Sequence, residues 1–262
     1  MERVVEVKII IHFIGMNIHR QIVYGKNLIG EFLLSLCYYF IQFIFIDKIS
    51  SFSGRIGSYS RDEIHLIFVL FVLLRVFLSI FTNSIRIFFE KVASGTVESY
   101  LIKPVSIWVF MLVGWCNPLR LINLCVLCVS AYFFVSLPDL SSITIGWCSF
   151  IVAMVCVFIV NICFCMMFNF ITFVTNRKMP VEYFYAMVYE LSFIPIAIYP
   201  SSIVKWFLFL LSMAFSASLP VSLLLGKNEW DIGYLLLSTF LSIAMTFMGY
   251  KKTSRKFNGL GG

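Results

Sequence analysis

The sequence predicts an all-α integral membrane protein that crosses the bilayer six times. Hydrophobic residues make up 61% of the 262 residues, charged residues make up 13%, and the mean hydropathy is +0.96. One soluble core could not bury this much apolar surface, and several apolar runs reach the length of about 20 residues that spans hydrocarbon. Charged residues separate these runs. The expected spans are Leu28–Ile46, Ile64–Asn83, Ile107–Val135, Ile143–Thr172, Tyr183–Tyr199 and Ile232–Tyr250.

Residues 1–27 are expected to form an amphipathic helix instead of a span. Charged and His residues recur there between apolar pairs such as Val4–Val5 and Ile10–Ile11. A helix of this kind lies in the headgroup plane, against the entrance of the bundle. The alternative is a short cytoplasmic tail helix without a special role. The charges do not fit a cleaved signal peptide, so the segment is expected to stay on the protein.

The basic residues predict the orientation of the chain. With six spans, most of the 20 Lys and Arg residues lie in connectors and tails on one side, including Lys251, Lys252, Arg255 and Lys256. The positive-inside rule then places both termini in the cytoplasm. We therefore expect one transmembrane domain, 1–262, with the interfacial helix in 1–27, the six-span bundle in 28–250 and a basic cytoplasmic tail in 251–262.

Ser201–Leu225 is apolar and long enough to form a further span. A seventh span would move the basic tail to the outside, against the positive-inside rule. We therefore expect a re-entrant hairpin or a pair of short helices that dips into the outer leaflet, with a break near Ser216–Pro220. Such backbone persists at membrane depth only where protein or a water-filled cavity covers it. A kinked full span is the alternative.

Composition and spacing argue against several other functions. The net charge of +7 arises from the connectors and not from a basic stripe with interleaved aromatics, which argues against nucleic-acid binding. The Cys residues are scattered through the apolar runs, and Cys125 and Cys128 have redox spacing without the flanking fold. His12, His19 and His65 are too far apart in the sequence to suggest a ligand set. We expect no catalytic residues, no metal site and no cofactor in this chain.

Three ionisable residues, Arg75, Arg120 and Glu190, lie within the expected spans. A charge there costs about 2.5–3.5 kcal/mol on insertion scales, so these side chains are expected to face the bundle interior or one another. They line a polar path or form an Arg–Glu pair that locks two helices; Arg120 has the further option of reaching the inner interface.

The connector between the second and third expected spans is polar. Apolar residues recur there with helical spacing, and charged residues occupy the other face: Ile85, Phe88, Phe89 and Val92 against Arg86, Glu90 and Lys91. Gly95 is expected to end this helix in a left-handed conformation, Thr96 to cap a second short helix, and Pro104 to stop that helix. The alternative is a tight intracellular loop in which Gly and Pro only punctuate the chain.

Three stretches carry a family resemblance: "SGTVESYLIKPVS", "PIAIYPSSIVKWFLFLLSMAFSASLPVSLLLGK" and "GYKKTSRKFNGLGG". The first resembles the cytoplasmic connector of six-span bacterial ABC-2 type transporter permeases, with its Gly, its acidic residue and its Leu-x-[Arg/Lys]-Pro turn. The second resembles the Pro-rich block of that family, and the third resembles its basic tail. The matches occur in the same order and at suitable spacing, so the resemblance covers most of the chain.

The resemblance implies a role for each of these stretches. The connector would be a coupling helix at about Phe89–Lys103 that docks in a cleft of a nucleotide-binding subunit. Its apolar anchors would be Tyr100 and Leu101, and the remaining site residues would be Phe89, Glu90, Lys91, Glu98, Lys103 and Pro104. Residues 201–225 would form outward re-entrant helices, with Pro200, Ser216 and Pro220 in the gate. Residues 1–27 would be the family's interfacial connecting helix.

The chain itself has no phosphate-binding P-loop. Neither Gly25–Lys26 nor Gly226–Lys227 fits G-x-x-x-x-G-K-[ST], so ATP and Mg²⁺ are expected on separate ATPase subunits. The resemblance implies an exporter in the bacterial cytoplasmic (inner) membrane, built from two ATPase subunits and two permease chains, identical or paralogous. This chain is then a transport subunit and not an enzyme, and membrane lipids surround it.

Two other classes of function remain open. An ion-gradient-driven secondary transporter or channel would use Glu190 and Arg75 as its intramembrane charges. Such transporters often contain inverted repeats with broken helices at matching positions, and the halves of this chain show no convincing repeat. A membrane scaffold without transport is the other alternative, which the intramembrane charges make less natural.

Overall fold

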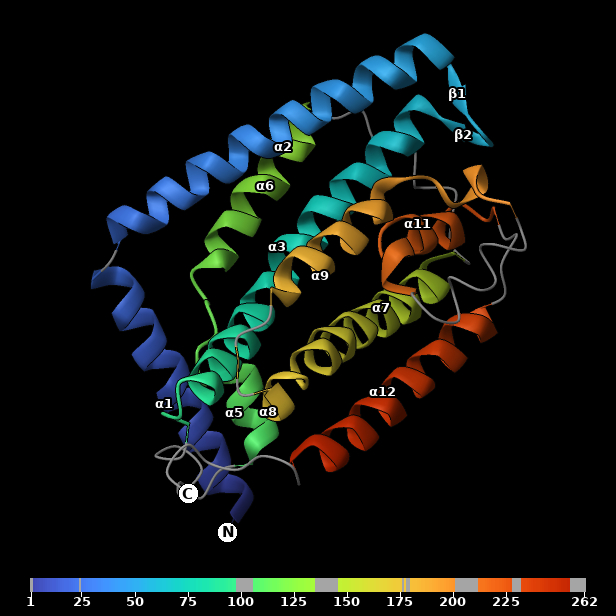
Figure 1. The fold of residues 1–262 in the computed structure, drawn as a ribbon. Helices are drawn as coiled ribbons and strands as arrows, with labels where there is room; N and C mark the ends of the chain where they lie inside the picture. Colours follow the sequence, from blue (N-terminus) through green and yellow to red (C-terminus); the bar gives the residue numbers. More distant parts are fainter. Residues whose placement is uncertain are drawn as a thin grey trace.

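The computed structural model describes residues 2–23, 25–97, 106–134, 146–175, 177, 180–200, 212–227 and 232–254. These residues form a helical bundle with one small β-hairpin (Figure 1). The helices are α1 (Glu2–Val23), α2 (Gly25–Ser53), α3 (Arg61–Ala93), α5 (Ile107–Val113), α6 (Arg120–Phe134), α7 (Gly146–Asn169), α8 (Thr172–Thr175), α9 (Val181–Glu190), α11 (Ser218–Leu224) and α12 (Ile232–Ser254), with 3-10 turns η1 (Leu191–Phe193), η2 (Ile196–Ile198) and η3 (Ser212–Phe215).

Within the described part of the chain, four helical segments are long and apolar enough to cross a membrane. They are Ile29–Phe52, Arg61–Ala93, Gly146–Thr175 and Ile232–Ser254. These segments coincide with the first, second, fourth and sixth expected spans. The all-α membrane class predicted from the sequence is therefore confirmed, whereas the other two expected spans have a different structure.

The third expected span, Ile107–Val135, is two helices instead of one. Helix α5 ends at Val113, the chain turns, and α6 begins at Arg120. Pro118 lies in this turn and has no backbone N–H to donate to a continuing helix. The prediction of one continuous span is therefore wrong, because apolar composition alone does not reveal where the helical hydrogen bonds stop.

Helix α1 covers the backbone of this turn. The Nδ2 of Asn17 donates hydrogen bonds to the carbonyl oxygens of Val113 and Gly114, both at 3.2 Å. The Nε2 of Gln21 donates to the carbonyl oxygen of Cys116 at 3.2 Å. Irregular backbone inside a membrane protein needs such partners. Residues 2–23 are helical, as expected, and they pack on the bundle; their position in the headgroup plane stays a prediction.

The fifth expected span, Tyr183–Tyr199, is also not a continuous helix. Helix α9 has 10 residues and is followed by η1 and η2, with Pro195 between the two turns. A helix needs about 20 residues to cross the hydrocarbon core. The prediction of one span here is corrected to a short helix that continues into tight turns.

Helices α2 and α3 are joined by β1 (Arg55–Ile56) and β2 (Tyr59–Ser60), which pair antiparallel. Gly54 and Gly57 both have φ of 62°, a left-handed conformation that glycine adopts without steric cost. Ser60 and Glu63 then form a capping box at the start of α3. The α2–α3 connection is therefore short and well defined.

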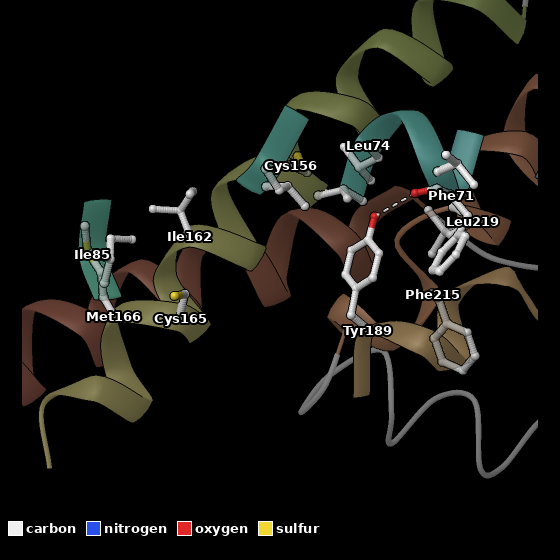
Figure 2. Packing of buried hydrophobic residues seen from close by; sticks show 14 of the residues in the cluster. Phe71, Leu74, Ile85, Cys156, Ile162, Cys165, Met166, Tyr189, Phe215 and Leu219 are labelled. Carbon is white, nitrogen blue, oxygen red and sulfur yellow. Dashed lines mark hydrogen bonds between the residues drawn. The ribbon is translucent and has the colours of Figure 1, made fainter. Parts of the chain in front are cut away.

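Helix α3 lies in the centre of the bundle, where it contacts α2, α5, α6 and α7. Its buried residues meet those of α7, α9 and α11 in one apolar core (Figure 2). The hydroxyl of Tyr189 donates a hydrogen bond to the carbonyl oxygen of Phe71 at 3.2 Å, and the two rings stack with centroids 5.3 Å apart. Helix α9 is thereby fixed to α3 through both the hydroxyl and the ring of Tyr189.

Residues 212–224 are buried against α7 and α12. Asn161 of α7 donates a hydrogen bond to the hydroxyl of Ser216 at 2.8 Å, and the hydroxyls of Ser212 and Ser238 are 2.8 Å apart. The chain turns at Ser216 and Ala217, between η3 and α11. Residues 201–211 lie outside the described residues, so the re-entrant shape of the whole segment stays a prediction.

The bundle has two distinct ends (Figure 1). The start of α1, the end of α3 and the end of α12 lie at one end, which we call the turn end. The β-hairpin lies at the opposite end, the hairpin end. Contacts support this arrangement, because Tyr250 of α12 packs on Trp108 of α5 with ring centroids 4.8 Å apart.

Candidate functional site

Helix α3 ends in a turn at Ser94–Val97. The backbone N–H of Ser94 bonds to the carbonyl of Glu90 at 3.0 Å, and the N–H of Val97 bonds to the carbonyl of Lys91 at 3.2 Å. Gly95 has φ of 71°. The predicted helix end at Gly95 is therefore confirmed. Because terminal carbonyls of α3 have backbone partners in the turn, the backbone of the turn is well defined, and Val97 is buried at 1% exposure.

A cluster of rings, which we call the aromatic platform, lies near the end of α3, before the turn: Phe88, Phe89, Phe170, Phe173 and Tyr250. Phe89 meets Phe88 and Phe173 with ring centroids 5.2 Å apart, and Phe170 at 5.9 Å. Tyr250 meets Phe170 at 6.0 Å and Phe173 at 6.4 Å. These separations are typical of favourable aromatic pairs. The platform links the end of α3 to the α7–α8 junction and to α12.

Phe89 has a different place from the one that the sequence predicted. Its side chain is 2% exposed and packs against the other rings of the platform, so it has no free surface for a partner. The apolar stripe with helical spacing contained this information, because Phe88 and Phe89 share it with the buried Ile85 and Val92. We therefore correct Phe89 from a docking residue to a supporting one.

The other predicted docking residues lie around this turn or outside the described residues. Glu90 pairs with Arg86 at 2.7 Å along the helix, and the Nζ of Lys91 stands 5.5 Å from the centre of the Trp115 ring. The remaining predicted residues, Glu98, Tyr100, Leu101, Lys103 and Pro104, lie outside the described part of the chain, and their roles stay predictions.

The second functional cluster lies between α2, α3 and α9. Arg75 of α3 pairs with Glu190 of α9, with 3.3 Å between Nη1 and Oε1. The hydroxyl of Tyr38 on α2 donates a hydrogen bond to the same carboxylate oxygen at 2.8 Å. The guanidinium also lies about 6 Å from three rings, namely 6.0 Å from Tyr38 and 5.9 Å from both Phe71 and Tyr189. Arg75 and Glu190 thus form the Arg–Glu pair that one of the two interpretations expects.

Arg120 takes part in a different interaction. Its Nη2 lies 3.7 Å from the Oε2 of Glu31 on α2, and the side chains are 30% and 66% exposed, respectively. Glu31 and Tyr38 were not predicted as partners of the intramembrane charges. Glu31 could have been predicted, because it is an acid close to the start of a long apolar helix. Tyr38 could not, since Tyr is common in such helices.

Other side chains that the sequence singled out are placed as follows. His65 is buried near the hairpin end, with its Nε2 3.2 Å from the Oδ1 of Asp47. Cys125 and Cys128 are exposed on α6. Among the described residues, no group of three or more His, Cys, Asp or Glu side chains could hold a metal ion. Ser216 and Pro220 are buried, and Pro200 is exposed; their role in a gate stays a prediction.

Long apolar helices with paired charges between them define a multi-pass α-helical membrane protein. The family model described as ABC-2 family transporter protein matches residues 36–261. The chain therefore belongs to this family, and it is a permease component of an ABC transporter, a class that associates with ATP-binding subunits. Searches of curated proteins and of solved structures found no match.

Proposed function

We propose that this chain is the permease subunit of an ATP-driven exporter, in which the connector after α3 docks on a separate ATPase. The family match over residues 36–261 carries the proposal, because it includes this connector and both helices that flank it. The local geometry supports it. The turn at Ser94–Val97 ends α3 at the turn end, and it directly precedes residues 98–104 in the sequence, which include the predicted docking anchors.

The aromatic platform offers a route for transmitting movement from the ATPase. Its rings come from α3, the α7–α8 junction and α12, and Trp108 extends the contacts to α5 at 4.8 Å from Tyr250. Protein interiors are close-packed, so a displacement of the turn shifts the helices that pack against it. Closure of an ATP-bound ATPase dimer would in this way reach several membrane helices together.

The proposed assembly has two such permease chains, identical or paralogous, and two ATPase subunits that bind ATP and Mg²⁺. Both termini face the cytoplasm of a bacterium, and the bundle lies in its inner membrane. The basic residues at the end of α12, Lys251 and Lys252, are consistent with this orientation under the positive-inside rule. Export is the direction that the resemblance implies.

The experiment is affinity purification of the tagged chain in mild detergent, for the native sequence and for Leu101→Glu. We expect the native chain to recover an ATPase subunit with ATP hydrolysis activity, and Leu101→Glu to lose both, because a carboxylate in an apolar docking groove is desolvated without a partner. Lys251→Glu is the matched control: it introduces the same side chain at an exposed position of the same end and should retain the partner.

Size-exclusion profiles and melting temperatures must agree between the variants, so that loss of the partner is not loss of the fold. Retention of the ATPase by folded Leu101→Glu would refute the docking assignment. If the native chain purified alone and without ATPase activity, the exporter proposal would fail. Ion-gradient transport through Glu190 would then replace it, since that carboxylate is 39% exposed and accessible to a proton or cation.

A further inference from the structure

A continuous groove runs along α3. Three neighbouring pockets form it, with volumes of about 310, 110 and 390 Å³. The first and second share the lining residues Leu36, Tyr39 and Leu127, and the second and third share Arg75, Ser79 and Arg120. Helices α2 and α6 flank the first two pockets, and α7 and α9 flank the third.

The polarity of the groove changes along its length. The first pocket is lined almost entirely by apolar side chains, such as Phe40, Phe43 and Val72, and lies toward the hairpin end. The second and third pockets lie toward the turn end, and their lining mixes apolar side chains with Arg, Asn, Ser and Thr side chains and, in the second pocket, Glu31. The lining residues of α2, α3 and α6 all become less polar toward the hairpin end. On α6, for example, Arg120 lines the second pocket and Ala131 lines the first.

The polar part of the groove has an excess of positive charge. Arg75, Arg86 and Arg120 line the third pocket, and no carboxylate does so among the described residues. Arg75 pairs with Glu190, and Arg86 pairs with Glu90. Arg120 differs, because within the described part of the chain its one carboxylate neighbour, Glu31, is beyond hydrogen-bond distance at 3.7 Å and largely exposed. Its guanidinium is therefore the group best placed to receive an anion.

We propose that this groove binds an acidic amphiphile, with its tail in the apolar pocket and its carboxylate or phosphate at Arg120, and that this amphiphile is the transported substrate. The inference rests on the proposed function, which it extends to a class of substrate. A guanidinium presents parallel N–H donors that match carboxylate and phosphate oxygens. The ligand enters from the leaflet at the turn end. Its acidic head then lies in the polar part of the groove, and its tail lies in the apolar pocket.

The size of the apolar pocket selects the kind of amphiphile. A volume of about 310 Å³ lies at the lower end of the range for ligand pockets. It therefore suits one tail better than the two tails of a phospholipid. A cationic amphiphile is disfavoured, since its head would stand beside three guanidinium groups. The occupant is accordingly a free acidic amphiphile and not a bilayer phospholipid.

The test uses the full chain with its co-purifying subunits in phosphatidylcholine nanodiscs. The probe is palmitic acid with a photoreactive diazirine in its tail, and mass spectrometry maps the labelled peptides. We expect saturable labelling of α2 and α6 around Leu36–Phe43 and Leu127–Ala131. Dodecyl phosphate should compete with the probe, and dodecyltrimethylammonium, which has the same tail, should not.

Variants at Arg120 and Ala131 separate the head site from the tail site, and Arg55→Gln is the control. Arg120→Gln should weaken binding of the probe about tenfold, the effect of one charge-assisted hydrogen bond. Arg120→Lys should restore much of the binding. Ala131→Phe should reduce labelling for acidic and neutral probes alike, because it fills the tail pocket. Arg55→Gln, an exposed Arg outside the groove, should leave labelling unchanged.

Equal competition by the cationic amphiphile, or unchanged labelling of folded Arg120→Gln, would overturn the proposal. Loss of labelling when phosphatidylglycerol is added to the nanodiscs would also overturn it, since the occupant would then be a bilayer lipid. The co-purified ATPase separates the two proposals. If the ATPase is present without Arg120-dependent labelling, only this inference fails; if labelling occurs without an ATPase, the exporter proposal fails and the site remains.

Discussion

The two ends of α3 are held by different kinds of interaction. At the turn end, aromatic rings from several helices surround Phe89, with centroid separations of 5.2 to 5.9 Å. At the hairpin end, the side chain of Lys227 forms an ion pair with Glu63, donates a hydrogen bond to the carbonyl of Ser58 at 2.7 Å and lies 4.5 Å from the centre of the Tyr59 ring. One end is apolar and packed, and the other is polar and directional.

This difference has a mechanical consequence. Aromatic pairs stay favourable over centroid distances of about 4.5–7 Å, so rings tolerate small tilts without losing contact. Hydrogen bonds weaken steeply when their geometry is distorted. We therefore expect α3 to move mostly at the turn end and to pivot at the hairpin end. This pattern suits a helix that receives movement at the turn end from a docked ATPase.

The largest expected effect is on the aromatic platform. Phe89→Ala should lower the free energy of unfolding by about 3–5 kcal/mol, because a buried ring is lost and a cavity remains. Phe52→Ala is the matched control, since Phe52 is 91% exposed, and it should change the stability by less than about 0.5 kcal/mol. Denaturation in detergent, followed by circular dichroism, measures both. Similar values for the two variants would contradict the packed character of the turn end.

A smaller effect is expected at the hairpin end. Glu63→Gln keeps the size of the side chain but removes the charge that pairs with Lys227, which should cost about 1.5–3 kcal/mol of stability. Hydrogen exchange should then increase in residues 55–63, and the ATPase should still co-purify because the turn end is unchanged. Loss of the ATPase from a folded Glu63→Gln variant would contradict the separation of the two ends. Arg55→Gln serves as the exposed control in the same hairpin.

The smallest effects are expected for two glycine substitutions, one in the turn and one in α1. The two should change the stability in opposite directions. Gly95→Ala should destabilise the protein by about 1–2 kcal/mol, because φ of 71° is unfavourable for a residue with Cβ. Gly15→Ala should stabilise it by about 0.5–1 kcal/mol, since Gly15 lies in α1 with nothing within 4 Å of the added Cβ. Thermal melts of the two variants test this. Shifts of the same sign would argue against the turn described for Gly95.

Local features of the chain were enough to predict part of this fold. Long apolar runs bounded by charge identified the helices around Ile64–Asn83 and Ile232–Tyr250, and one glycine identified the end of α3. The family was recognisable from short stretches of the same kind. The break in Ile107–Val135 was less accessible. Pro118 is visible in the sequence, but the turn depends on Asn17 and Gln21 for its hydrogen bonds, about a hundred residues earlier.

The sequence by itself determined the membrane class, the long apolar helices, the turn after α3 and the membership in the ABC-2 family, because apolar length and backbone preference are local properties. Only the tertiary structure decided that Arg75 pairs with Glu190, that Arg120 faces Glu31 and that Phe89 is buried. Those outcomes depend on which helices pack together. An intramembrane charge must find a partner, but its spacing along the chain does not specify which one.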